Sequence, residues 1–521
     1  MTTPLAPAFA MTALALVLAG CTAPAESTPD AVTALPPSIQ AIMDQPIYTD
    51  ARWGLSVVNL DSGETLISYN PDEKFLTGST AKILSVTAAL AELGADATLT
   101  TPVVAVGDVS GGTLDGDLVL RGAGDLTLGG RTMADGTIDV PIFDHYDANA
   151  LPGVATLTPE DPLAGVDDLA RQVADAGITR VAGDVLVDDR LWEPVVLDEV
   201  PISPIVVNDN LVDFVLVPGT AAGEPATFEW RPQTAAYHPA VDVTTGAADS
   251  DIDITIEESG DGILSITGSV PLGADPVVQT YQVADPAQWA RVLFVEALAR
   301  AGVTVDADPL AAATGTLPTS VELDALTPIA TFTSPPFSET ARLINKVSHN
   351  LGANQLPLIL AAREGLTTLE EGLAIEMAAL QAGGLTSADV EIADGQGLPG
   401  NRITPAGMTT YLRYLTGTDT FRTFYDSTPI LGVDGSLANV LPEGDPAIGA
   451  AHAKTGTLVG AGVSTPFVLE TKALAGYLDA ASGERFAFAV FVNDVPIHDV
   501  SAVFEANNDL GAIASQLYQL Y

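Results

Sequence analysis

Apolar and polar residues alternate near the N-terminal end of the chain, and this pattern then changes to a helical one. Residues 52–60 and 65–70 alternate with the period of a strand, and the turn-forming residues DSGE separate them at 61–64. Over residues 77–93 the apolar positions recur every three or four residues, and Gly94 provides a stop. The pattern predicts a strand hairpin followed by a buried helix.

The C-terminal end repeats this combination of strands and helix. Residues 473–478 and 486–493 are apolar and strand-like, and a turn sequence joins them at 482–485. The closing segment, 502–520, has apolar positions at helical spacing and is expected to cover these strands. Both ends of the chain therefore indicate one α+β domain.

The middle of the chain, about residues 101–324, has a different pattern of apolar and turn-forming residues. Short β-like runs alternate with Gly, Asp and Pro turns there, and two helical patterns lie among them at 166–176 and 288–301. The β-like runs are 117–120, 181–187, 213–217, 253–257 and 264–267. We predict a β-rich insert of one or two small domains at 101–324, threaded into a domain whose halves are 38–100 and 325–521.

An apolar run at residues 5–20 leads directly into Cys21, the single cysteine of the chain. The run is too short to span a membrane comfortably and lies where a secretory signal belongs. Residues 18–21, LAGC, resemble the bacterial lipobox, in which the cysteine becomes lipidated. We expect 1–20 to be a lipoprotein signal peptide, Cys21 the lipidation site, and 21–37 a Pro/Ala/Thr-rich tether. An ordinary buried cysteine after a core helix is the alternative.

The charge of the chain excludes several kinds of partner. It carries 20 basic and 67 acidic residues, a formal net charge of −47. The negative charge repels phosphates and so excludes a basic surface for nucleic acid. It also opposes electrostatic binding to anionic lipid, so attachment to a membrane would need another means, such as a lipid anchor. One cysteine and five scattered histidines offer no disulfide and no metal-ligand spacing, so we expect neither metal nor cofactor.

Lysine is rare in this chain, so the positions of the five lysines are informative. Ser79 and Lys82 stand three residues apart at the start of the first predicted helix, which puts both side chains on one face. A serine becomes nucleophilic when a base takes its proton, and a lysine can be that base when burial lowers its pKa. An ordinary solvent-facing lysine explains this pair equally well.

Two later segments change this balance. Ser348 and Asn350 form a Ser-x-Asn, with a hydroxyl to relay protons and an amide to orient a lysine or a substrate. Farther on, a cation, two hydroxyls and a glycine that admits a substrate backbone come together in Lys454, Thr455, Gly456 and Thr457. Ser-x-x-Lys, Ser-x-Asn and Lys-Thr-Gly in this order are the signature of penicillin-binding proteins and serine β-lactamases.

The spacing of the motifs resembles that of one subfamily, the low-molecular-mass class C penicillin-binding proteins, or D-alanyl-D-alanine carboxypeptidases of peptidase family S13. That family has a large insert between its first two motifs, and here Ser348 follows Ser79 by 269 positions (348 − 79). Residues 116–128, 181–189 and 207–210 are similar to the family's insert signatures, and 394–398 followed by 401–405 to its Asp-Gly-Ser-Gly-Leu segment. The resemblance covers roughly residues 45–521.

Three departures from the family pattern lie beside these motifs. Thr77-Gly78 stands where the family has Pro-Ala, and His349 stands where the family has Asp in the middle of its Ser-x-Asn motif. Gln396 stands where the family has the serine of its Asp-Gly-Ser-Gly-Leu segment. None of them removes a motif residue.

The resemblance implies a penicillin-binding-protein-like transpeptidase fold and a two-step acyl transfer on peptidoglycan stem peptides outside the cell. Ser79, with Lys82 as base, would attack the penultimate D-Ala carbonyl and expel the terminal D-alanine. Ser348 and Asn350 would relay protons and hold Lys82, while backbone N–H groups of Ser79 and Thr457 would form the oxyanion hole. The Lys-Thr-Gly-Thr segment would bind the terminal carboxylate. Water would release the acyl-enzyme, and β-lactams would trap it.

Other functions remain open at this point. A β-lactamase is disfavoured, because no glutamate between the second and third motifs has the Asn four positions later that class A requires, and Ser348 stands where class C has Tyr. A non-catalytic, lipid-anchored peptidoglycan-binding protein that kept the fold is the alternative from a different class. The residues also leave open whether the enzyme cuts cross-links as an endopeptidase.

Overall fold

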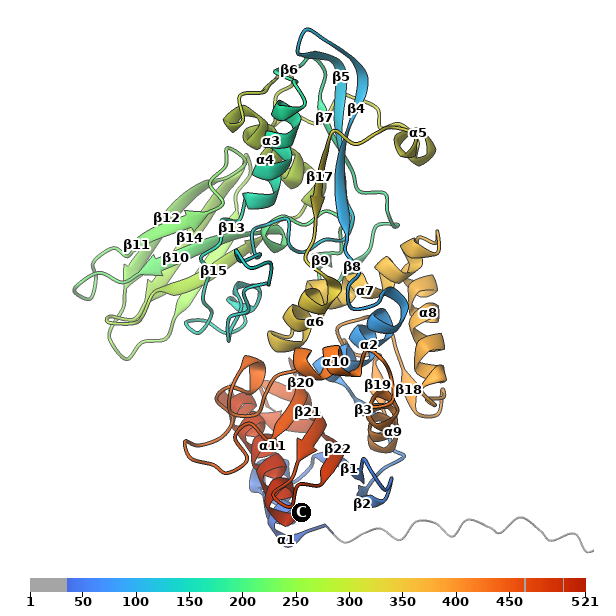
Figure 1. Ribbon diagram of the computed structural model, residues 1–521. Coiled ribbons are helices and arrows are strands. Elements are labelled where there is room, and N and C mark those ends of the chain that lie inside the picture. The colour runs from blue at the N-terminus through green and yellow to red at the C-terminus, as the bar shows by residue number, and fades with distance from the viewer. Residues whose placement is uncertain (1–34, 463–464, 500) are drawn as a thin grey trace, which may run out of the picture.

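The computed structural model describes residues 35–462, 465–499 and 501–521 (Figure 1). The predicted signal peptide, Cys21 and all of the predicted tether before Leu35 lie outside the described residues. Among the helices that are described, none combines the length and the apolar character needed to cross a membrane. Figure 1 shows an elongated molecule with the insert at one end and the part that carries the chain's C-terminus at the other.

A five-stranded antiparallel sheet joins the two ends of the chain. Its strand order is β2-β1-β22-β21-β20, so the N-terminal hairpin pairs directly with the C-terminal strands, as at Leu55 opposite Val490. The strands are β1 (Arg52–Asn59), β2 (Thr65–Tyr69), β20 (Ala451–Ala461), β21 (Phe467–Asp479) and β22 (Arg485–Ile497). The predicted hairpin and C-terminal strands are confirmed, and β21 and β22 are longer than predicted.

Helices cover both faces of this sheet because its strands bury side chains alternately on each side. Along β22, Val490 and Val492 pack with the cluster under α11, whereas Phe491 packs with the cluster around α2. On the first face lie α1 (Pro37–Met43) and α11 (Ser501–Leu520). The other side carries α2 (Ala81–Leu93), α6 (Phe337–Lys346), α7 (Asn350–Arg363), α8 (Leu369–Ala382), α9 (Pro405–Leu415) and α10 (Phe421–Ser427). A small sheet, β18-β19-β3, adjoins them with strands Val390–Glu391, Arg402–Ile403 and Phe75–Leu76.

The insert is built on a six-stranded sheet of order β16-β6-β5-β4-β17, with β7 paired to β5. Its strands are β4 (Thr100–Ser110), β5 (Thr113–Arg121), β6 (Arg180–Val181), β7 (Val185–Asp188), β16 (Thr304–Val305) and β17 (Ala330–Thr333). The predicted strand at 181–187 is therefore two short strands. Because β17 pairs with β4, this sheet includes residues beyond position 324.

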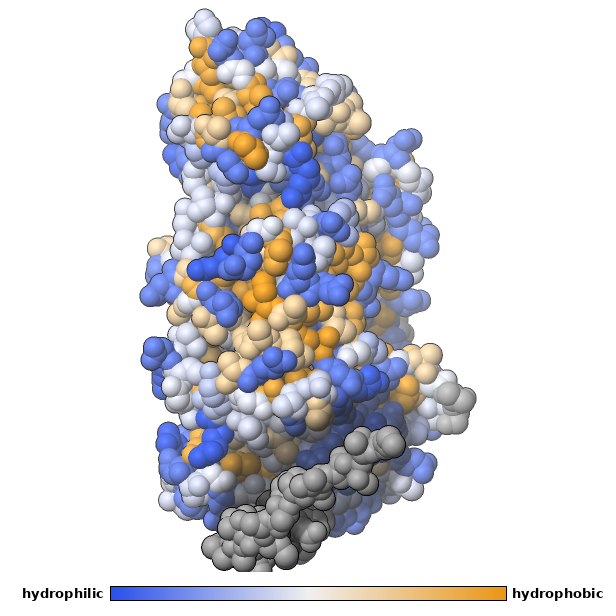
Figure 2. Space-filling view, turned by 90° about the vertical axis from the view of Figure 1, so that its right-hand side faces the viewer, coloured by the Kyte–Doolittle hydropathy of each residue, from blue (hydrophilic) through white to orange (hydrophobic). Residues whose placement is uncertain are grey.

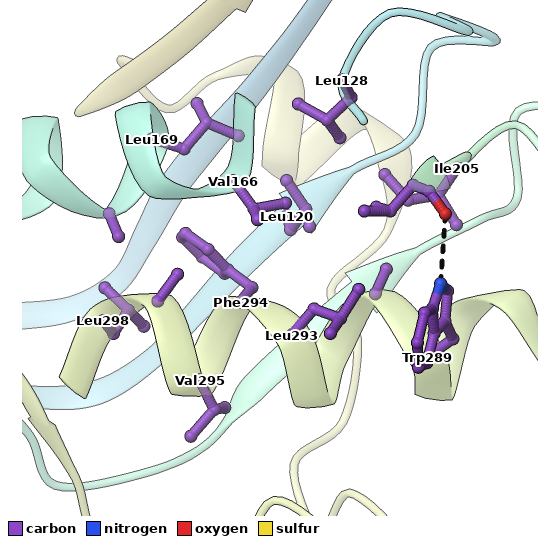
Figure 3. Packing of buried hydrophobic residues seen from close by; sticks show 14 of the residues in the cluster. Leu120, Leu128, Val166, Leu169, Ile205, Trp289, Leu293, Phe294, Val295 and Leu298 are labelled. Carbon is purple, nitrogen blue, oxygen red and sulfur yellow. Dashed lines mark hydrogen bonds between the residues drawn. The ribbon is translucent and has the colours of Figure 1, made fainter. Parts of the chain in front are cut away.

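Two helices of the insert, α3 (Ala164–Asp175) and α4 (Pro286–Arg300), enclose a continuous apolar core. Figure 3 shows Phe294 and Leu293 of α4 facing Val166 of α3 and Leu120 of β5. The indole of Trp289, which is labelled in Figure 3, donates a hydrogen bond to the Val207 carbonyl oxygen, and the two atoms lie 3.2 Å apart. This packing fixes the loop that follows Val207, in which Asp209 contacts His349 of the part built on the five-stranded sheet.

The remaining strands of the insert form two three-stranded sheets and a short pair. Their orders are β11-β10-β15 and β12-β14-β13, and the pair is β8-β9. The bounds are β8 (Val196–Leu197), β9 (Val200–Pro201), β10 (Leu211–Val217), β11 (Thr227–Arg231), β12 (His238–Thr245), β13 (Asp253–Glu258), β14 (Ile263–Val270) and β15 (Val277–Gln282). Phe214, Val243 and Ile266 from these sheets belong to the same apolar cluster as the helices, so the largest cluster of the insert spans its sheets and its helices.

The surface reflects the acidic composition. Figure 2 shows a face that is mostly hydrophilic, with hydrophobic side chains gathered at mid-height between the two ends of the molecule. A largely apolar hollow lies where the insert meets the part of the molecule built on the five-stranded sheet. It is lined by Leu93, Leu126, Phe337 and Ile359.

Candidate active site

Ser79 lies in a short 3₁₀ turn, Gly78–Thr80, that leads from β3 into α2. Gly78 has a φ of +48°, and a Cβ at this position would lie 2.6 Å from the backbone nitrogen of Thr457. At Gly456 a Cβ would lie 2.2 Å from the Thr77 carbonyl oxygen. The two glycines therefore let the turn press against β20 and bring Ser79 beside Thr457. This close approach is the physical reason for Gly78 at this position.

Lys82 lies one turn into the same helical segment and is fully buried. Its Nζ donates to Ser79 Oγ at 2.7 Å and to Asn350 Oδ1 at 2.6 Å, and it lies 3.4 Å from Ser348 Oγ. Burial lowers the pKa of Lys82 to about 7, and the charges of Asp147 and Asp394 limit the shift. Near neutral pH a large fraction of Lys82 is therefore unprotonated and able to accept a proton.

Ser348 and Asn350 stand at the junction of α6 and α7. Ser348 has a left-handed backbone with φ of +63°, and the next residue, His349, caps α7. The His349 Nδ1 accepts a hydrogen bond from the Gly352 N–H at 3.0 Å, which leaves the ring proton on Nε2, 3.2 Å from Asp209 Oδ2. His349 thus ties the Ser-x-Asn segment to Asp209 of the insert.

Asp209 is the centre of a buried charged cluster contributed by the insert. Its Oδ2 contacts His145 Nε2 at 2.9 Å and also accepts a hydrogen bond from Arg131. The Arg131 guanidinium in turn holds Asp144 through two hydrogen bonds of 2.8 and 2.9 Å. The histidines are scattered along the sequence, but the fold brings His145 and His349 to one carboxylate.

This cluster includes three side chains with metal-binding chemistry. Ligand atoms of Asp144, His145 and Asp209 lie within 4.8 Å of one another. The guanidinium of Arg131 already supplies a positive charge to both carboxylates. A metal ion would have to displace this guanidinium, so the arrangement fits an internal ion-pair network better than a metal site.

The third predicted segment lies on β20, at the edge of the five-stranded sheet. Lys454 is fully buried, and its Nζ donates to Ser348 Oγ at 2.9 Å and to the Thr455 carbonyl oxygen at 3.0 Å. Burial, together with the charges of Lys82 and Lys472, lowers the pKa of Lys454 well below its usual range. The structure thus brings the motifs together: Ser79, Lys82, Ser348, Asn350 and the Lys454–Thr457 segment of β20.

Two neighbours of this site do not belong to the motifs. Lys472 of β21 lies opposite Thr457 and donates to its Oγ1 at 2.8 Å. Asp147 of the insert lies close enough to Lys82 and Lys454 to interact with their charges, and burial together with Asp144 raises its pKa to about 6. The scarcity of lysine could have drawn attention to Lys472, whereas no sequence signal connects Asp147 with the motifs.

The fold is that of the penicillin-binding proteins. The chain superimposes on penicillin-binding protein 4 (dacB) of Haemophilus influenzae with a TM-score of 0.66 at 18% identity, covering 92% of this chain and 99% of that one. The Haemophilus protein is also known complexed with a novel β-lactam, and that structure has the same TM-score of 0.66.

The chain belongs to the D-Ala-D-Ala carboxypeptidase 3 (S13) family, whose model matches residues 35–517. The D-alanyl-D-alanine carboxypeptidase of Actinomadura sp. (strain R39) is 31% identical over 487 residues, which cover 89% of this chain and 81% of the relative. The carboxypeptidase DacB of Haemophilus influenzae is 21% identical over 485 residues, covering 88% and 89%. The predicted family, the α+β fold class and the enzyme type, a serine D-Ala-D-Ala carboxypeptidase, are confirmed.

Proposed function

We propose that the protein removes the terminal D-alanine from peptidoglycan stem peptides through an acyl-enzyme on Ser79. The observation that carries this proposal is the 2.7 Å hydrogen bond between Ser79 Oγ and the buried Nζ of Lys82. A nucleophile in hydrogen-bond contact with a base whose pKa lies near the working pH is the arrangement that acyl transfer requires.

The proposed reaction has two steps. Neutral Lys82 takes the proton of Ser79 Oγ, which attacks the penultimate carbonyl carbon while the backbone N–H groups of Ser79 and Thr457 stabilise the oxyanion. Lys82 gives this proton back through Ser348, which contacts both Lys82 and Lys454, to the amine of D-alanine as the C–N bond breaks. Water then attacks the ester carbonyl and gives a proton to Lys82, which returns it to Ser79 Oγ as the shortened peptide leaves.

The third motif would bind the substrate. As an edge strand, β20 presents backbone N–H and C=O groups that an extended stem peptide can pair with. Lys454, Thr455 and Thr457 would bind its terminal carboxylate, and Gly456 allows a close backbone approach. β-Lactams would acylate Ser79 in the same way and deacylate slowly, since the leaving amine stays attached to the acyl group.

We also propose an extracytoplasmic location on a lipid anchor at Cys21. The support is the lipobox-like sequence at 18–21 and the apolar run at 5–20 that leads into it. A family that acts on peptidoglycan fits this location. Mass spectrometry of the protein extracted from membranes will show a diacylglyceryl-modified Cys21, and an unmodified thiol would contradict the anchor.

Covalent labelling tests the proposed activity directly. Incubating the protein with a fluorescent penicillin is expected to give one covalent label per chain, and incubation with a D-Ala-D-Ala peptide to release D-alanine. A chain that takes no label and releases no D-alanine would be the non-catalytic peptidoglycan-binding protein. A cross-linked muropeptide dimer in the same assay will show whether endopeptidase activity accompanies the carboxypeptidase.

The pH dependence of acylation follows from Lys82. Because its pKa is lowered to about 7, Lys82 is protonated below this pH and cannot accept the serine proton. The second-order rate constant for β-lactam acylation should fall about tenfold per pH unit below 7 and level off above it. Stopped-flow measurement from pH 5 to 9 will check this, and a flat profile across pH 7 would contradict Lys82 as the base.

A further inference from the structure

Lys472 is a buried cation to which the family motifs assign no role. It lies on β21 directly opposite Thr457, is only 4% exposed and donates to Thr457 Oγ1 at 2.8 Å. No carboxylate of the described residues forms an ion pair with it, although the chain has 67 acidic residues. Burial lowers its pKa to about 7, with no neighbouring acid to oppose the shift.

An unpaired buried ammonium is costly to the fold. Taking a charge out of water is unfavourable unless a counter-charge and hydrogen bonds compensate. Lys472 has three N–H donors, and within the described residues only Thr457 Oγ1 accepts from it. A group kept in this state at an active site is a candidate for a role with an anionic substrate.

The hydrogen bond from Lys472 also determines how Thr457 can act. A threonine hydroxyl has one proton, and an oxygen that accepts from an ammonium directs its own O–H elsewhere. Thr457 lies on the same face of the sheet as Thr455, because residues two apart on a strand share a face. When Lys472 is protonated, a state that a nearby anion favours, the Thr457 hydroxyl is therefore set as a donor toward a ligand held along β20, with the positive charge of Lys472 behind it.

We propose that Lys472 is a positioning residue of the carboxylate subsite, which holds the Thr457 hydroxyl as a donor and supplies the charge that selects an anionic terminus. This proposal rests on the proposed function and extends its binding site from β20 to β21. The ligand class is a free carboxylate: the C-terminus of a D-Ala-D-Ala peptide or the ring carboxylate of a β-lactam.

The test compares benzylpenicillin with its methyl ester, which lacks the carboxylate charge. Lys472→Met should lower the second-order acylation rate constant for benzylpenicillin roughly tenfold to a hundredfold, the range for a charge-assisted hydrogen bond. The methyl ester should change less than about threefold, since it has no charge to lose. Lys472→Arg should keep more of the preference for the acid than Lys472→Met does. Removal of an unpaired buried charge should also raise the Tm of Lys472→Met.

Each result of this comparison is decisive. Equal losses on acid and ester would make Lys472 a structural residue, and no loss on either would remove it from the site. If neither compound labels even the wild-type protein, the proposed function fails rather than the role of Lys472. Should Lys472→Met not fold, the wild-type penicillin adduct decides by crystallography. Its carboxylate should lie within about 3.2 Å of Thr457 Oγ1 while Lys472 still contacts that oxygen, and a carboxylate elsewhere would overturn the proposal.

Discussion

Replacing Ser79 by alanine is expected to abolish covalent labelling by penicillin and to reduce D-alanine release by roughly 10⁴-fold or more, the loss seen when an enzyme loses its nucleophile. The variant should keep its fold, because Ser79 is only partly buried and, among the described residues, only Lys82 forms a hydrogen bond with its Oγ. Mass spectrometry after incubation with benzylpenicillin should show the unmodified mass.

Ser85→Ala is the matched control for this experiment. Ser85 lies farther along α2, is buried, and donates its hydroxyl to the Gly395 carbonyl oxygen at 2.9 Å. Its substitution removes one structural hydrogen bond, worth about 1 kcal/mol, and should leave labelling intact. Label that persists on Ser79→Ala would place the nucleophile elsewhere, and a peptide map would then identify it.

Elements at the two ends of the chain could be predicted because each carries a local signal in the sequence. Helix α11 keeps exposed positions among its buried ones, so helical periodicity shows in its residues. Strand β1 and helix α2 are buried almost throughout, but the DSGE turn marks the hairpin and Gly94 marks the end of the helix. Helix α7 is also buried along almost its whole length, and no polar face marks it, while Pro357 inside it argues against a helix. The strands β11 and β12 of the insert were also missed, since their exposed, polar residues resemble loops.

The residues of the candidate site also fall into two groups: those that a sequence motif indicates and those that only the fold brings together. Short linear motifs identify residues whose chemistry and local spacing are distinctive, such as Ser79 with Lys82. Contacts between distant segments leave no such mark: His349 and Asp209 lie 140 positions apart, and Lys472 meets Thr457 only through strand pairing. His349, a departure from the family motif in sequence, becomes intelligible as the cap of α7 once Asp209 lies beside it.

Replacing Asp209 by alanine should produce the largest loss of stability among these substitutions. Its Oδ2 is a shared acceptor for Arg131, His145 and His349, all buried. These partners hold the pKa of Asp209 well below its usual range, and burial alone would raise it. Removing one member of a buried charged network leaves the others uncompensated, so the free energy of unfolding should fall by about 3–5 kcal/mol. Urea denaturation at pH 7 and 25 °C measures this.

Asp306→Ala provides the matched control, because it also removes an aspartate from an arginine in the insert. The Arg180–Asp306 pair has side chains that are 53% and 35% exposed, and solvent screening keeps its contribution to stability small. If the two variants lose similar stability, the cluster around Asp209 does not hold the insert to the catalytic part.

The Asp209→Ala variant also connects the stability of the fold with catalysis. His349 caps α7, whose first residue is Asn350, the acceptor for Lys82. Without Asp209, the His349 ring loses its Nε2 partner, and a small shift of the Ser-x-Asn turn would lengthen the contacts of Lys82. Displacements of this size cost up to about 100-fold in rate. We therefore expect acylation of folded Asp209→Ala to slow by roughly tenfold to a hundredfold, with Asp209→Asn between it and wild type. Unchanged acylation in a destabilised variant would make the network purely structural, since the insert would then support the fold without orienting Ser348 and Asn350.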